Sequence, residues 1–100
     1  TIKILDKQLK LISKIPKIDL AFIDGNHNKD ATIKYFNLLI ENMNENAILI
    51  FDDIHWSNDM EKAWEEIKES TKVTLTIDLF FVGLVFIDKK LSKENYIIRF

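Results

Sequence analysis

Two short apolar runs, each ending in acidic residues, constrain the fold of this 100-residue chain most strongly. Ile18–Ile23 leads into Asp24, and Ala47–Phe51 leads into Asp52 and Asp53. Runs that are apolar nearly throughout, without clean alternation, are typical of strands that helices cover on both faces of a parallel sheet. We therefore predict one α/β domain over residues 1–100, with an open, mostly parallel sheet and helices on both faces.

Three other segments have apolar residues at helical spacing and are predicted to be helices. They are Ile4–Ile15, which Pro16 stops, Lys29 to about Met43, and a helix from about Asn58 that buries Met60, Ala63, Trp64 and Ile67. Asn28 is the expected N-cap of the second helix, and Asn58 with Glu61 resembles a capping box for the third.

The C-terminal third of the chain contains three further strand-like segments, namely Val73–Ile77, Gly83–Ile87 and Tyr96–Phe100. The connections between them are too short for helical crossovers, so we expect these strands to pair as antiparallel hairpins at the edge of the sheet. The predicted element order is α-β-α-β-α-β-β-β.

Composition excludes several classes of function. The net charge of −2 and the pI of about 5.6 leave no basic footprint for nucleic acid. The longest apolar run, Leu79–Ile87, is far shorter than the about 20 residues that a membrane span needs. The absence of cysteine excludes disulfides, zinc–thiolate sites and thiol catalysis. We therefore expect a cytoplasmic protein that binds neither nucleic acid nor membrane.

The acids at the strand ends are the main candidate ligands for a metal ion. If the two strands are neighbours, Asp24, Asp52 and Asp53 meet at one edge of the sheet, where ligands bind in such folds. Three carboxylates so close repel one another, so a cation lies among them or one stays protonated. Oxygen ligands suit Mg²⁺ or Ca²⁺. The alternative is that each acid only caps a turn or a helix.

Two histidines and a tryptophan lie near these acids. His27 follows Asp24 on the same loop and is a candidate general base, or else a cap for the next helix. His55 and Trp56 follow the acidic pair, where they would contact a substrate at the rim of the site. The alternative for Trp56 is that it packs against Met60 in the core.

Other interpretations of the acidic strand end fit the sequence less well. A nucleoside triphosphatase would need a Gly-x-x-x-x-Gly-Lys loop, and the only glycines are at positions 25 and 83. A phospho-receiver domain would carry its acidic pair on its first strand. A hydrolase would need an activated nucleophile, and the nearby Ser57 has no sequence feature that activates it.

The order of these motifs resembles the C-terminal half of class I S-adenosylmethionine-dependent methyltransferases. The residues are Ile18–Ile23 followed by Asp24-Gly25-Asn26-His27, and then Phe51-Asp52-Asp53. A bacterial branch of that family carries such an Asp-Gly-x-His loop and Asp-Asp pair. Val73–Asp78 and Gly83–Ile87 resemble its terminal β-hairpin.

The resemblance implies a Rossmann-like sheet and methyl transfer from S-adenosylmethionine to a small-molecule acceptor, through O-methylation with assistance from a divalent metal ion. Carried over residue by residue, Asp24, Asp52 and Asp53 would hold Mg²⁺. His27, in the loop where such enzymes place substrate and base residues, is the candidate base.

The sequence departs from the family in its N-terminal part. The Gly-rich loop after the first strand and the acid after the second are missing, and the segment ahead of Ile18 cannot hold two βα units. We therefore expect a fragment that alone neither binds the cofactor nor methylates. The strand Ile18–Ile23 would then have an unpaired edge, which predicts either a homodimer along it or an aggregation-prone monomer. The alternative function is a non-catalytic, methyltransferase-like dimerisation or binding module.

Overall fold

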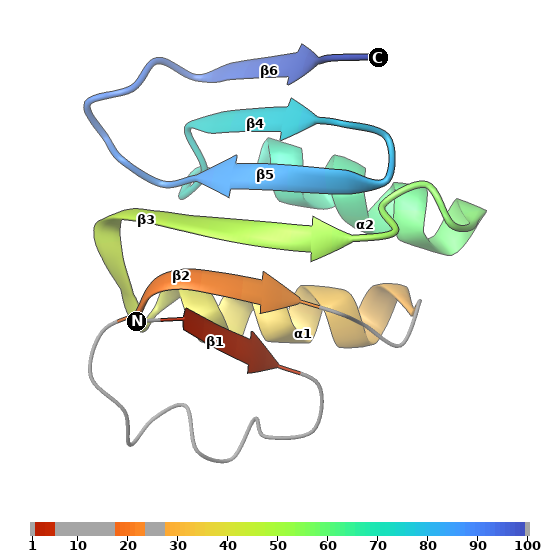
Figure 1. Cartoon of the computed structure of the whole chain (residues 1–100), viewed down its shortest axis with the longest axis horizontal. Helices are drawn as coiled ribbons and strands as arrows, with labels where there is room; N and C mark the ends of the chain where they lie inside the picture. Colours follow the sequence, from red (N-terminus) through yellow and green to blue (C-terminus); the bar gives the residue numbers. More distant parts are fainter. Residues whose placement is uncertain (1, 6–17, 24–27, 100) are drawn as a thin grey trace.

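The computed structural model describes residues 2–5, 18–23 and 28–99. The elements in chain order are β1 (Ile2–Leu5), β2 (Ile18–Ile23), α1 (Lys29–Ile40), β3 (Met43–Asp52), α2 (Asn58–Glu69), β4 (Leu75–Asp78), β5 (Val82–Phe86) and β6 (Glu94–Ile97). The strands form one sheet of order β1-β2-β3-β5-β4-β6, in which β5 runs against the other described strands (Figure 1). The predicted α/β class and mostly parallel sheet are confirmed.

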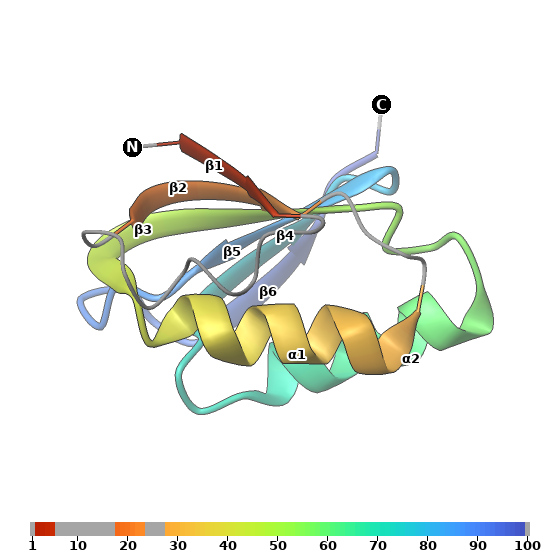
Figure 2. The same cartoon turned by 90° about the horizontal axis from the view of Figure 1, so that it is seen from below.

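Both described helices lie on the same face of the sheet (Figure 2). The prediction of helices on both faces is therefore wrong for the described residues. The physical reason is topological, because the connections β2-α1-β3 and β3-α2-β4 step in the same direction across the sheet. Right-handed crossovers that step in the same direction place their helices on the same side.

The C-terminal strands differ in part from the expected hairpins. β4 and β5 form the predicted antiparallel hairpin, but β5 lies between β3 and β4 in the sheet. Since both edges of β5 are already paired, the next strand pairs with the free edge of β4. β6 therefore runs parallel to β4 and forms the edge of the sheet, in place of the antiparallel edge that we predicted.

The first element is a strand where we predicted a helix. Ile2–Leu5 pairs in parallel with β2, with Ile2 opposite Leu20 and Leu5 opposite Ile23. The rest of the predicted helix lies outside the described residues. β2 therefore has a partner on each side, β1 and β3, which satisfies its backbone N–H and C=O groups. The prediction that Ile18–Ile23 has an unpaired edge is therefore wrong. The homodimer that we predicted from this edge loses its support.

The core lies between the sheet and the two helices. β3 turns its buried side chains, Met43, Ala47, Leu49 and Phe51, toward the helices. α2 buries Met60, Ala63, Trp64 and Ile67, as predicted, and α1 buries Thr32, Tyr35, Phe36 and Leu39. The ring of Phe51 lies between those of Phe36 and Trp64, at centroid distances of 6.3 and 6.5 Å. No described helix is long and apolar enough to cross a membrane.

Side-chain caps fix the start of each helix. Asn28 caps α1 as predicted, because its Oδ1 accepts a hydrogen bond from the Ala31 N–H at 3.0 Å. α2 is capped by Ser57 and not by Asn58, since the Ser57 hydroxyl accepts from the Met60 N–H at 3.2 Å. This contact gives Ser57 a structural role.

Gly83 allows α2 to approach the sheet closely. A Cβ atom at this position would lie 2.5, 2.7 and 3.0 Å from three atoms of the Trp64 ring. Real Cβ contacts are not that short, so a side chain would push the indole and α2 away from β5. The close contact needs a residue without a side chain.

We expect Gly83→Ala to lower the free energy of unfolding by about 1–3 kcal/mol, because it overpacks the Trp64 contact. Urea unfolding of the wild type and the variant measures this difference. In a Trp64→Leu background the ring is gone, so Gly83→Ala should cost much less. An equal cost in both backgrounds would show that the indole contact is not the reason for glycine.

Candidate active site at the carboxyl ends of the strands

The ends of β2 and β3 lie side by side, as the sequence predicts. Ile23 is opposite Phe51, so the carboxyl ends of the two strands share one edge of the sheet. Asp24 and His27 lie outside the described residues, and their predicted roles stay predictions. In the described part of the chain, no three His, Cys, Asp or Glu side chains are grouped as metal ligands.

The acidic pair shapes the turn that follows β3. Asp52 is the last residue of β3 and lies opposite Val82. Asp53 has a φ of 57°, a left-handed conformation that Asp tolerates better than most residues. Its N–H donates to the Phe81 carbonyl at 2.8 Å, and its own carbonyl accepts from the Trp56 N–H at 3.0 Å. Asp53 therefore turns the chain sharply toward α2.

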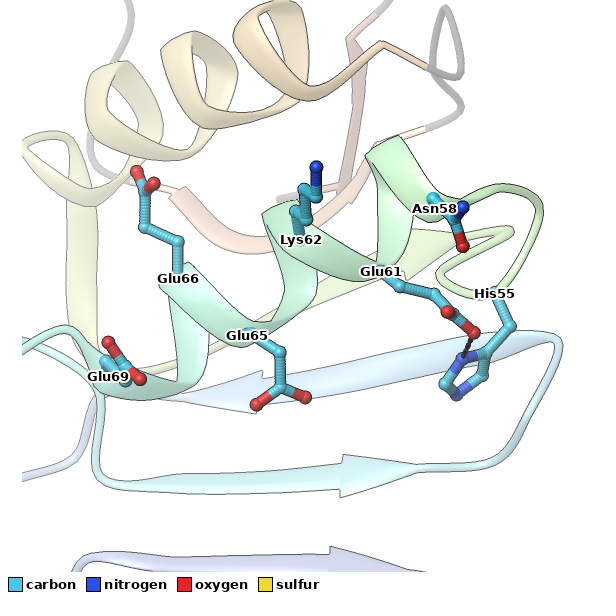
Figure 3. Close-up of a pocket in the computed structure, with 7 residues that line it drawn as sticks. All are labelled: His55, Asn58, Glu61, Lys62, Glu65, Glu66 and Glu69. Atoms are coloured by element: carbon cyan, nitrogen blue, oxygen red, sulfur yellow. Dashed lines mark hydrogen bonds and ion pairs between the residues drawn. The ribbon is translucent and has the colours of Figure 1, made fainter.

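His55 lies between two carboxylates. Its Nε2 is 2.7 Å from Asp78 Oδ2, and its Nδ1 is 2.8 Å from Glu61 Oε2 (Figure 3 shows the Glu61 contact). Three elements meet here, because His55 follows β3, Glu61 is on α2 and Asp78 ends β4. Our sequence analysis missed Asp78, although it follows the same pattern of an acid at a strand end.

Asp78 is the buried centre of this cluster, with only 4% of the residue exposed. Its Oδ1 accepts hydrogen bonds from the Phe80 N–H at 2.8 Å and from Arg99 Nη1 at 3.2 Å. A buried carboxylate is costly unless it is paired and hydrogen-bonded. His55 and Arg99 supply positive charge, and the Phe80 N–H supplies a further donor.

The carboxylates favour the charged form of His55. Partial burial acts to lower the pKa of His55, but the hydrogen bonds to Asp78 and Glu61 outweigh it and raise that pKa above its ordinary value. For Asp78, burial acts to raise the pKa, but the contacts with His55, the Phe80 N–H and Arg99 hold it below its usual range. Folding therefore favours a charged His55–Asp78 pair.

An aromatic cleft of about 250 Å³ opens beside this cluster, lined by Asp53, His55, Trp56, Phe80 and Phe81. The imidazole of His55 stacks on the Phe80 ring at 5.4 Å, and Phe81 meets Phe80 edge-on at 5.0 Å. Trp56 is 64% exposed, so it lies at the rim as predicted and not in the core against Met60.

A second hollow follows the outer side of α2 (Figure 3). Besides His55, it is lined by Asn58, Glu61, Lys62, Glu65, Glu66 and Glu69. Apart from Glu61, which reaches His55, these side chains form the solvated face of an amphipathic helix.

The aromatic cleft by itself is small for S-adenosylmethionine, whereas the hollow along α2 is larger, at about 590 Å³. The aromatic cleft of about 250 Å³ is smaller than the about 300–1,000 Å³ of typical ligand pockets. The Trp64 ring occupies the space beside Gly83, the glycine in the described part of the chain. A cofactor therefore cannot approach the backbone there. The cleft has room for one ring with short substituents.

The sheet order and the crossovers define an α/β fold, and in open sheets of this kind ligands commonly bind at the carboxyl ends of the strands. Residues 3–54, just over half of the chain, match the family model described as a methyltransferase domain, and the chain belongs to this family.

A solved structure has a similar fold. It is the crystal structure of cofactor-bound Rv0187 from MTB, with a TM-score of 0.62 and 15% sequence identity. The match covers 80% of this chain and 45% of that chain, so this chain spans less than half the length of its structural relative. A comparison with proteins of curated function found no match.

The charged pair predicts how stability depends on pH. The raised pKa of His55 contributes stability that is complete below its unfolded pKa of about 6.5 and is lost as the pH rises through the folded pKa. The lowered pKa of Asp78 contributes stability above about pH 3.9 that is lost as the pH falls. The pair should therefore stabilise most between about pH 4 and 6.5.

We expect His55→Gln to lower the free energy of unfolding by about 1–3 kcal/mol in that window, because two charge-assisted hydrogen bonds are lost. Urea unfolding at several pH values should show this difference shrink toward alkaline pH. Lys62→Gln, at the exposed position next to Glu61 on α2, is the matched control and should give a small difference at every pH. A constant deficit for His55→Gln would contradict the charged pair.

Proposed function

We propose that this protein is part of an S-adenosylmethionine-dependent methyltransferase that methylates a hydroxyl group of a small-molecule acceptor. The observation that carries the proposal is the family match over residues 3–54, which includes β2, α1 and β3 and ends just beyond Asp53. The likeness in fold to cofactor-bound Rv0187 supports it. S-adenosylmethionine supplies an electrophilic methyl group when it is bound.

In this proposal, the residues of this chain bind the methyl acceptor and remove its proton. An acceptor hydroxyl must give up its proton as its oxygen becomes methylated, and His27 is the proposed base. His55 is less suited to that step because carboxylates occupy both of its ring nitrogens. His55 and Trp56 are instead proposed to contact the acceptor, with His55 also supporting Phe80.

Asp24, Asp52 and Asp53 are the proposed ligands of a divalent metal ion. Carboxylate oxygens are the ligands that Mg²⁺ prefers, and the register of β2 and β3 brings the carboxyl ends of these two strands to one edge of the sheet. The described residues do not form such a site by themselves. The metal ion therefore stays a prediction that a titration can test.

We expect calorimetry of this chain to give no heat with S-adenosylhomocysteine, because the sequence contains no Gly-x-Gly loop for the cofactor. Mg²⁺ should give a signal that Asp53→Asn abolishes and that Asp88→Asn, in the loop after β5, leaves unchanged. Binding of S-adenosylhomocysteine in the micromolar range would contradict the expectation that the cofactor site lies elsewhere in the protein.

Methyl transfer itself is tested in the longest natural protein that carries this sequence. His27→Ala should lower the rate by about 10²–10⁴-fold, as expected for loss of a general base. Asp88→Asn is again the control. A protein that transfers no methyl group from S-adenosylmethionine to any hydroxylated acceptor would contradict the proposed function.

A second candidate function is a non-catalytic assembly module, and the edge strand β6 favours it. Three consecutive residues at this edge, Tyr96, Ile97 and Ile98, are large, apolar and exposed. Within the described residues β6 pairs with β4 alone, so its outer edge offers backbone groups to another strand. A dimeric mass in light scattering, together with silence in both titrations, would favour this function over catalysis.

A further inference from the structure

The strand at the outer edge of the sheet, β6, is much more exposed than its neighbours (Figure 1). All of its residues are exposed, whereas alternate side chains of β4 and β5 are buried. Tyr96 is 48% exposed, Ile97 66%, and Ile98, directly after the strand, 44%. Large apolar side chains that gather on a surface mark a site of association. The two described helices leave these side chains uncovered, so their burial needs another molecule.

The backbone of β6 is paired along one side only, within the part of the chain that the structure describes. The N–H groups of Glu94 and Ile98 donate to carbonyls at the two ends of the β4 segment, at 3.0 and 2.9 Å. N–H and C=O groups point to alternate sides along a strand, so those of Asn95 and Ile97 point away from β4. Outward groups of this kind are a template for a further strand.

This edge lacks the features that usually protect an edge strand. Natural proteins block such pairing with charged residues, proline or a β-bulge. The segment Asn95-Tyr96-Ile97-Ile98 contains no charged residue and no proline, and the pairing of β4 with β6 has no register shift. The partner that this edge fits is therefore a β-strand, and its side chains must suit an apolar edge.

The register across the sheet places the exposed apolar side chains on both of its faces. Ile97 continues the row of Gly83 and Asp78, and Gly83 contacts the indole of α2, so Ile97 lies on the helix side. Tyr96 and Ile98 alternate with it and lie on the opposite face. A partner strand must therefore offer apolar side chains on both faces at matching positions.

We propose that β6 pairs in antiparallel fashion with β6 of a second copy of this chain, with Ile97 on the two-fold axis. In this register Ile97 lies opposite Ile97 of the second copy, and Tyr96 lies opposite its Ile98. Each exposed apolar side chain then meets an apolar partner on its own face. The outward backbone groups pair as well, those of Ile97 with each other and those of Asn95 with Arg99 of the second copy.

Charge favours this register over a neighbouring one. If Tyr96 lay opposite Tyr96, Lys93 would lie opposite Arg99, and like charges directly opposite each other destabilise a strand pair. In the proposed register Asn95 takes that position instead. The segment is thus self-complementary about Ile97, as a two-fold contact between identical chains requires. This self-complementarity is the reason to assign the edge to a second copy.

The proposed contact ends beside the candidate active site. Arg99 pairs through its backbone, while its guanidinium donates to the Asp78 carboxylate at 3.2 Å and lies 5.2 Å from the centre of the Phe80 ring. Pairing therefore holds the segment that supports one wall of the aromatic cleft. The inference rests on the second candidate function, to which it gives a partner, a strand and a register, and it is independent of methyl transfer.

The first test is the mass of the full chain in light scattering, without cofactor. We expect a mass that rises with concentration toward twice the 11.8 kDa of one chain. A contact between two strands is small, so the dissociation constant should lie in the micromolar range. Ile97→Lys places two like charges at the axis and should raise that constant at least about 100-fold. Leu91→Lys makes the same change at an exposed apolar residue of the β5–β6 loop and is the matched control.

Ile97→Pro tests the backbone pairing itself. The Ile97 N–H points away from β4, so proline at this position removes no hydrogen bond within one chain. The variant should therefore fold and be monomeric. Cooperative urea unfolding checks that each variant is folded, and Ile97→Lys tests the same contact if the proline variant does not fold.

Cysteine variants test the register, since the chain has no cysteine of its own. Ile97→Cys should oxidise to a disulfide-linked dimer, because directly opposite residues of such a pair have Cα atoms about 5.5 Å apart. Asn95→Cys, on the same face, is the control. Its two copies would be offset by about 14 Å along the strands, which is too far for a disulfide.

The proposal is overturned if the wild-type chain stays monomeric up to about 1 mM, or if Ile97→Lys and Leu91→Lys have the same dissociation constant. A folded Ile97→Pro variant that still dimerises would overturn the backbone pairing. Equally fast cross-linking of Asn95→Cys and Ile97→Cys would overturn the register. A monomer leaves the methyltransferase proposal standing, whereas a dimer that also transfers methyl groups would contradict the non-catalytic function and leave the strand pairing in place.

Discussion

The contact between Trp64 and Gly83 fixes the distance between α2 and the sheet. The indole lies over a glycine in β5 and beside Phe51 of β3, so one helix residue packs against two neighbouring strands. The Ser57 cap fixes the start of α2, directly after the turn that carries His55 and Trp56. A glycine inside a strand is normally weakening, but here it allows the layers of the fold to close.

The buried carboxylate of Asp78 then connects the helix layer with the sheet edge. It pairs with His55 from the β3–α2 turn, with Arg99 after β6, and with the Phe80 N–H of its own turn. Each partner offsets part of the cost of burying the charge. His55 and Arg99 also contact the aromatic ring of Phe80. The Asp78 carboxylate therefore influences both the charge of the cluster and the position of the ring that lines the cleft.

The family match and the cleft draw on different parts of the chain. The match ends at residue 54, so it includes Asp53, whereas His55, Asp78 and Phe80 all lie beyond it. The matched segment supplies the central strands that bring the carboxyl ends together. The segment after it supplies the aromatic rings and their supports, and it is here that we expect the selectivity for a ligand to lie.

The sequence by itself determined the elements that local spacing specifies, namely β2, β3, the buried face of α2 and the Asn28 cap. Each depends on side chains a few residues apart, whose periodicity or capping chemistry can be read directly. The tertiary structure decided the rest. Ile4 and Leu5 became a strand because β2 offered backbone partners, and both helices came to one face because the crossovers step the same way. His55 and Asp78 are 23 residues apart, and their contact exists only because β3 and β4 lie in one sheet, an arrangement that no local pattern encodes.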